Sequence, residues 1–165
     1  MAAIFNFILL PFFNPEMKLN LPSYEVNIRE NPRQGREIYD DFRKKFVRLT
    51  PEEWVRQHFL HYLVSEKHYP ASLIGVEKGL MVNGMQKRFD AVVFRNDSKP
   101  AVLIEFKAPS VRIHQGVFDQ VASYNLLLNA NYLMVSNGLT NYCCKMDYQH
   151  HQYTFLDNIP DFKKL

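Results

Sequence analysis

The sequence is short of three things: cysteine, long apolar runs and an excess of charge of one sign. Its two cysteines, Cys143 and Cys144, are adjacent, so they cannot build a disulfide framework and are typical of reduced thiols in a cytoplasmic protein. The apolar run at residues 2–13 is too short to span a bilayer, and it lacks the basic start and the small-residue cleavage site of a signal peptide. We therefore expect a cytoplasmic location and no membrane partner.

Charge is nearly balanced, with 20 basic and 17 acidic side chains and a net charge of +3. This mild excess permits a nucleic-acid partner but does not by itself indicate one. Of the 165 residues, 47% are apolar and 22% are charged, which is typical of a globular domain with a core. The sequence has no evident internal repeat, low-complexity tract or Gly/Ser linker, so it predicts a single domain.

The first 22 residues differ from the rest and are predicted to form a leader or arm, residues 1–22. Pro11 and Pro15 break any helix there, and Met17 opens a more ordinary sequence, MKLNLPSYEV. Residues 1–16 are therefore interpreted as an upstream-start extension or as an arm that packs on a partner. The folded domain is expected to cover residues 23–165.

Local patterns predict the order of helices and strands. Thr50 can cap a helix that has Pro51 in its first turn and Glu53 closing a capping box, and this helix is expected to end near residues 67–69. A second amphipathic helix is expected over residues 114–128. Strands are predicted from period-two alternation or buried apolar runs at residues 24–29, 73–77, 88–94, 100–106, 132–136, 141–146 and 152–156.

Residues 29–48 fit two structures. Ile38, Phe42 and Phe46 have helical spacing, which favours a helix, although β structure is also compatible. Taken together, the order αβββαβ plus extra strands predicts an α/β (α+β) sandwich, in which helices flank a central mixed sheet. A doubly wound dinucleotide fold is excluded because helices do not alternate with every strand.

Three polar side chains fall where an apolar core is expected. Asp90 lies in the predicted strand 88–94, and Glu105 and Lys107 end the most apolar strand, two residues apart and hence on one face. The two strands should form a hairpin, which can bring the Asp90 and Glu105 carboxylates together. Paired carboxylates near a core repel each other, and a divalent cation would relieve that repulsion. The pattern therefore indicates a Mg²⁺ site.

The same three residues also fit a purely structural interpretation. Glu105 and Lys107 could be a surface ion pair at the exposed end of a strand, and Asp90 could be a hairpin residue. An E-x-K triplet alone is common and does not indicate a metal site. The specific pattern is the whole arrangement: an Asp-bearing strand, a turn, an apolar strand ending in E-x-K, and then an amphipathic helix.

This arrangement resembles a known nuclease family. The segments RFDAVVF and AVLIEFKAP are similar to the core of the PD-(D/E)xK nuclease superfamily, which has a restriction-endonuclease-like fold. More narrowly, residues 17–161 resemble the N-terminal nuclease domain of type I restriction enzyme R subunits. The segments that carry this narrower resemblance are LNLPSYEVNIRE, RKKFVRLTPEEWVRQHFLHYL, IEFKAPS, FDQVASYN and LMVSNGLTNYCCKMD.

The resemblance implies a metal-binding catalytic centre. Asp90 and Glu105 would bind Mg²⁺, for which Mn²⁺ would substitute, helped by the Phe106 carbonyl. Lys107 would assist the attacking water. Phe89 stands where the superfamily's name has proline, a position that varies.

Three further catalytic residues are implied by the resemblance. Gln120 and Tyr124 fit the Q-x-x-x-Y element that follows E-x-K, and one helical turn separates them so that both can face the site. Glu53 would match the acidic residue of the first helix. Each has another interpretation: Tyr124 as a core residue, Gln120 as an exposed one, and Glu53 as part of its capping box.

The predicted function is that of a divalent-metal-dependent DNA endonuclease. The alternative is a non-catalytic nucleic-acid-binding or assembly module on the same fold. Type I R subunits carry an ATP-driven motor after the nuclease domain, and these 165 residues contain none. DNA is therefore the expected partner, with other restriction-modification subunits or a separate motor protein as further partners. The basic residues expected to meet the phosphate backbone near the site are Lys78, Lys87, Arg88 and Arg112.

Overall fold

The structure is a computed structural model that describes residues 17–33, 35–77, 79–82 and 84–165. The extension predicted over residues 1–16 lies outside the described residues. The remainder of the predicted leader is attached to the domain. Leu19 is buried in the core, Asn20 N donates to the Gly138 carbonyl at 2.7 Å, and Trp54 Nε1 donates to the Met17 carbonyl at 3.2 Å.

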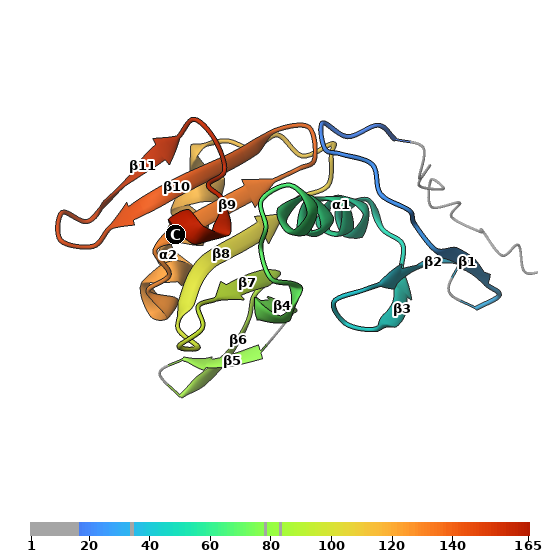
Figure 1. The fold of residues 1–165 in the computed structure, drawn as a ribbon, viewed down its shortest axis with the longest axis horizontal. Helices are drawn as coiled ribbons and strands as arrows, with labels where there is room; N and C mark the ends of the chain where they lie inside the picture. Colours follow the sequence, from blue (N-terminus) through green and yellow to red (C-terminus); the bar gives the residue numbers. More distant parts are fainter. Residues whose placement is uncertain (1–16, 34, 78, 83) are drawn as a thin grey trace, which may run out of the picture.

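Six strands form a central mixed sheet in the order β11-β10-β9-β8-β7-β4 (Figure 1). Neighbouring strands are antiparallel except β8 and β9, which are parallel. The hairpin predicted before the E-x-K motif is the β7–β8 pair, in which Ala91 lies opposite Ile104. The strand bounds are β4 Ile74–Val76, β7 Ala91–Phe94, β8 Pro100–Phe106, β9 Tyr132–Ser136, β10 Asn141–Asp147 and β11 Gln152–Leu156.

Two helices cover opposite faces of this sheet (Figure 1): α1 spans Pro51–Ser65 and α2 spans Gln115–Leu128. The alternation of side chains along β8 serves both faces. Ile104 packs in the core cluster that contains α1, whereas Leu103 packs in the cluster that contains α2. The described residues also form two short 3-10 helices, Ala71–Leu73 and Phe162–Lys164. The predicted α/β sandwich with its mixed sheet is confirmed.

The helical interpretation of residues 29–48 is wrong. Three antiparallel strands lie there: β1 Ile28–Asn31, β2 Gly35–Asp40 and β3 Lys45–Arg48. Ile38 and Asp40 are fully buried and, two residues apart, lie on the same face of β2, as the alternation of side chains along a strand requires. Of the strand predicted at residues 24–29, only Ile28 and Arg29 fall in β1.

The strand predicted at residues 88–94 is divided. Arg88 ends β6 (Met85–Arg88), which pairs with β5 (Gly79–Val82), and Ala91 begins β7. The sequence analysis missed the β5–β6 hairpin. Phe89 and Asp90 lie between the two strands, and this break frees Asp90 from the β7–β8 ladder.

Candidate active site

Asp90 sits in the bend before β7, not inside a strand as predicted, and reaches across to the end of β8. Its Oδ2 accepts a hydrogen bond from the Phe106 backbone N–H at 2.8 Å, and its Oδ1 accepts one from Arg56 Nη2 at 3.2 Å. The bond to Phe106 fixes the carboxylate beside the two residues that flank Phe106 in sequence. The structure thus brings Asp90 to the E-x-K motif.

Glu105 and Lys107 form an ion pair at the end of β8. Lys107 Nζ lies 2.7 Å from Glu105 Oε1, and each side chain is 25% exposed, so solvent reaches the pair. The Lys107 backbone N–H donates to the Ser136 carbonyl of β9 at 2.9 Å, which extends the sheet contact past the strand end. Glu105 is aligned with Val135, so it lies on the face that α2 covers.

Burial and neighbouring charges shift the pKa values of both members of this pair. Burial, reinforced by the nearby Asp90 carboxylate, raises the pKa of Glu105 despite its bond to Lys107. Burial alone would lower the pKa of Lys107, but the hydrogen bond and charge of Glu105 raise it overall, with help from Asp90. Lys107 is therefore a charged donor at neutral pH, and Glu105 is less acidic than an ordinary glutamate.

Glu52 is an acidic neighbour of this group that the sequence analysis missed. It lies in the first turn of α1 with its side chain 44% exposed. Burial and the Asp90 charge raise its pKa, while the charges of Arg56 and Lys107 oppose that rise. The two adjacent acidic residues at the helix start, Glu52 and Glu53, were the sequence signal for an acid of α1 near the site. Side chains at adjacent helix positions point about 100° apart, so only one of the two can face the site.

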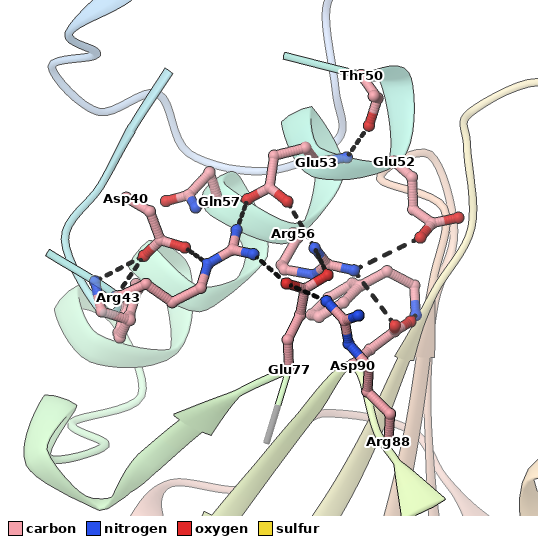
Figure 2. Close-up of polar contacts among 12 residues, drawn as sticks. Asp40, Arg43, Thr50, Glu52, Glu53, Arg56, Gln57, Glu77, Arg88 and Asp90 are labelled. Atoms are coloured by element: carbon pink, nitrogen blue, oxygen red, sulfur yellow. Dashed lines mark hydrogen bonds and ion pairs between the residues drawn. The ribbon is translucent and has the colours of Figure 1, made fainter. Parts of the chain in front are cut away.

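Glu53, the predicted acid of the first helix, is engaged elsewhere (Figure 2). The Glu53 backbone N–H donates to Thr50 Oγ1 at 3.0 Å, which confirms the predicted N-cap. Its carboxylate, however, is nearly buried and accepts hydrogen bonds from Arg43 Nη2, Arg56 Nη1 and Gln57 Nε2. With three donors around it, Glu53 holds the two arginines in place.

Those arginines connect the N-terminal strands to the candidate site (Figure 2). Arg43 pairs with Asp40, Glu53 and Glu77, and its side chain is only 11% exposed. Arg56 is 5% exposed and pairs with Glu53 at 2.5 Å and Asp90 at 3.2 Å. The Asp90 carboxylate is therefore fixed by a buried cation on one side and a backbone N–H on the other.

The four basic residues predicted to contact phosphate lie in different surroundings. Arg88 pairs with Glu77 at 2.7 Å, and Arg112 is exposed in the loop before α2. Lys78 lies outside the described residues, as does the side chain of Lys87. Although burial would raise the pKa of Glu77, its bond to Arg88 and the charges of Arg43 and Arg56 lower it overall, so this end of the network is well compensated.

Gln120 and Tyr124 lie together on α2, where Gln120 Nε2 donates to Tyr124 Oη at 3.3 Å. Tyr124 is 41% exposed, so it is not a core residue. Gln115 and Asp119 of α2 contact Tyr153 on β11, whereas helical spacing turns residues 120 and 124 to the opposite flank of α2, away from β11. The hydrogen bond described for Gln120 and Tyr124 therefore joins these two side chains to each other.

In the part of the chain that the structure describes, no group of three or more His, Cys, Asp or Glu side chains is arranged to hold a metal ion. Any metal here would depend on the two carboxylates Asp90 and Glu105, with the Phe106 carbonyl as the predicted third protein ligand. No described helix has both the length and the apolar character that a membrane span requires.

Comparisons with known proteins agree with this architecture. The family model of the type I restriction enzyme R protein N terminus (HSDR_N) matches residues 51–160, which include α1, Asp90, the E-x-K motif and α2. No curated protein matches the sequence.

A solved structure that shares the fold is a fragment described as an HsdR subunit of a type I restriction enzyme from Vibrio vulnificus YJ016. It has 20% sequence identity and a TM-score of 0.52. The similarity covers 70% of this chain and 25% of that one, so this chain spans about a quarter of that protein's length. The matched family model and the arrangement around β8 agree: this chain belongs to the family of type I restriction enzyme R protein N-terminal domains.

Proposed function

We propose that this chain is a nuclease domain that hydrolyses DNA phosphodiesters with the help of Mg²⁺ or Mn²⁺. The observation that carries the proposal is the 2.8 Å hydrogen bond from Phe106 N to Asp90, because it places an aspartate beside Glu105 and Lys107. Membership of a restriction R-protein family supports a nuclease-type role. PD-(D/E)xK chemistry is the mechanism that this set of side chains fits best.

The donor set suits a hard divalent cation. Mg²⁺ in phosphoryl-transfer sites is bound by one or two carboxylates and completes its shell with water and substrate phosphate oxygens. Asp90 and Glu105 supply two carboxylates. Burial first, and the Asp90 charge second, raise the pKa of Glu105, and a bound cation would favour the ionised form of both groups. The Phe106 carbonyl is the proposed third ligand. When bound, the metal would activate water and stabilise charge developing on the phosphate.

Protein side chains are proposed to orient the attacking water, to position Asp90 and to bind the substrate. Lys107, charged and partly exposed, is proposed to orient the attacking water and to contact the phosphate. Arg56 holds Asp90 in position through its 3.2 Å contact. Gln120 and Tyr124 are proposed to position the substrate from α2. Glu53 is assigned to the support of Arg43 and Arg56, and Glu52 is the acidic residue of α1 proposed to face the cluster.

A second candidate function has its own support. Each carboxylate of the site already has a cationic partner, Arg56 for Asp90 and Lys107 for Glu105. That arrangement also suits a non-catalytic module that binds nucleic acid or assembles with other restriction-modification subunits or a separate motor protein. Such a module would show salt-dependent DNA binding without metal-dependent hydrolysis.

The two functions are separated by plasmid cleavage with a matched pair of lysine variants. Supercoiled plasmid and single-stranded DNA are incubated with the protein and Mg²⁺ or Mn²⁺. Lys107→Ala should abolish cleavage, whereas Lys99→Ala should cut like the parent, because Lys99 is an exposed lysine just before β8 that pairs with Asp97. Cleavage by Lys107→Ala at the parental rate would refute the mechanism. DNA binding without any cleavage by the parent would favour the second function.

Metal binding can be measured without activity. A ligand that binds only the folded state stabilises it by about 2.7 kcal/mol at 100 times its Kd. For a chain of this size that corresponds to a rise in melting temperature of about 5–10 °C. Mn²⁺ should give this rise in the parent and not in the double variant Asp90→Asn/Glu105→Gln. An equal rise in both proteins would place the metal elsewhere.

A further inference from the structure

Three aromatic rings of the outer strands β10 and β11 and one of α2 gather on the face of the sheet to which Glu105 also belongs. Phe118 of α2 is buried at their centre, 5.5 Å from Tyr142 and 5.0 Å from Phe155 between ring centroids. Tyr153 lies 5.7 Å from Phe155. We call Phe118, Tyr142, Tyr153 and Phe155 the aromatic platform. It sits where β10 meets β11, and β11 is the outermost strand of the sheet (Figure 1).

The platform is more exposed than a core cluster. Tyr142 is 38% exposed and Phe155 is 45% exposed, although both rings contact the buried Phe118. The ring contacts are edge-to-face, with interplanar angles of 89° and 81° to Phe118. Rings held edge-on by a buried neighbour are fixed in orientation while part of their surface remains open to solvent.

Strand register places this platform close to the candidate site. Glu105 is aligned with Val135, and Val135 is aligned with Tyr142, so the three form one row across β8, β9 and β10. At about 4.8 Å per strand, Tyr142 is about 10 Å from Glu105. About three stacked nucleotides at about 3.4 Å each would span that distance.

The loop between the two regions carries cations. Residues 107–114 link β8 to α2, with Lys107 at one end and the exposed Arg112 near the other. The loop is tied to the β9–β10 turn, because Asn137 Nδ2 donates to the Val111 carbonyl at 2.8 Å. A phosphate backbone that runs from Glu105 to Tyr142 would therefore cross a positively charged loop.

We propose that the aromatic platform stacks unpaired bases, so that single-stranded or locally unpaired DNA is the substrate class delivered to the Asp90–Glu105–Lys107 site. This inference rests on the proposed function. Only unpaired bases offer a free face to an aromatic ring, and base–aromatic stacking is tolerant of sequence. The rim of the platform is polar as well: the Tyr153 hydroxyl is bonded to Gln115 and lies 3.4 Å from the Asp119 carboxylate.

The experiment is DNA binding in EDTA, which is independent of catalysis. Fluorescence anisotropy measures the affinity of the full chain for a labelled oligo-dT and for a matched duplex. Phe155→Ala and Tyr142→Ala should each weaken oligo-dT binding by about 5- to 150-fold, the range expected for loss of one stacked base. Leu126→Ala, which removes an apolar side chain on α2 that is even more exposed than the two rings, should leave oligo-dT affinity unchanged. Phe155→Tyr keeps a ring and should bind like the parent.

The salt dependence supplies a second measurement. Arg112→Ala should reduce the slope of log Kd against log salt by about one, whereas the ring variants should keep the parental slope. Unchanged oligo-dT affinity in both ring variants, with the parental melting curve, would overturn the platform, and so would a preference for the duplex. If the proposed nuclease function is wrong but the platform is correct, oligo-dT binding will still depend on the two rings, and no cleavage will follow when metal is added.

Discussion

Arg56 offers the sharpest test of how the site is held. Its side chain is 5% exposed, and it pairs with Glu53 at 2.5 Å and with Asp90 at 3.2 Å, with Glu52 and Glu77 each at 3.5 Å. Its guanidinium also lies 5.7 Å from the centre of the Phe106 ring. Arg56→Met keeps much of the side-chain volume and removes the charge, so it isolates the ionic contribution.

The expected loss of stability follows from what the substitution leaves behind. Removing one partner of a buried ion pair costs about 3–5 kcal/mol, because the remaining charge is buried without compensation. Glu53 would retain Arg43, whereas Asp90 would retain only the Phe106 N–H among the contacts described for its carboxylate. We therefore expect about 3 kcal/mol, the lower end of that range, and a fall in melting temperature of about 6–12 °C.

Urea unfolding of the full chain measures this loss, with Arg36→Met as the matched control. Arg36 pairs with Glu30 at 2.9 Å, but the side chains are 43% and 72% exposed. Exposed pairs contribute little, so the control should change stability by less than about 1 kcal/mol. If Arg56→Met unfolds within about 1 kcal/mol of the parent, the arginine network does not hold Asp90 and the reasoning fails.

Two further predictions concern the packing around α1. Gly138→Ala should destabilise the fold by about 2–4 kcal/mol in urea unfolding, because the residue has φ +79° and its new Cβ would lie 2.7 Å from Leu19 Cδ2. Gly84→Ala is the control: the residue has φ +76° but open space around it, so the substitution should cost only about 1–2 kcal/mol. Equal losses of stability in the two variants would refute the close contact with Leu19. Burial lowers the pKa of His58 and of His61, so their stabilising contribution is full above the unfolded pKa of about 6.5 and is lost as pH falls through their folded values. His58→Asn/His61→Phe should therefore flatten the fall in melting temperature between pH 7 and pH 5, and an unchanged slope would contradict this origin.

The sequence predicted the central layers well because their signals are local. Thr50 caps α1, and residues 100–106 form a buried central strand, as their apolar run indicated. The E-x-K motif lies at the end of that strand, and Asp90 reaches it. A hairpin with a short turn leaves little freedom of register, so the sequence could predict that Asp90 and Glu105 can meet, although the meeting depended on the register of the two strands.

The parts that were missed depend on long-range contacts. Glu53 was explained by a local cap, but its carboxylate is bound by Arg43, ten residues earlier in the chain, and by Arg56. Residues 29–48 have an apolar spacing that suits a helix, and only pairing with neighbouring strands decides for β structure. The adjacent acidic residues Glu52 and Glu53 were visible in the sequence, but only the charge of Asp90, from a distant segment, identifies Glu52 as the one near the site.

The carboxylates at the two ends of the arginine network have pKa values shifted in opposite directions. Around Arg43 the balance is favourable, and the pKa of Glu77 is lowered by Arg88, Arg43 and Arg56. At the other end, the pKa values of Glu52 and Glu105 are both raised, with burial as the first cause and Asp90 as the second. The three carboxylates there, Glu52, Asp90 and Glu105, have Arg56 and Lys107 as their cationic partners, and Arg56 is also paired with Glu53 and Glu77, which leaves a net negative charge at the end of β8. A divalent cation would offset that charge, so the proposed metal would both relieve the carboxylates and favour the approach of a phosphate.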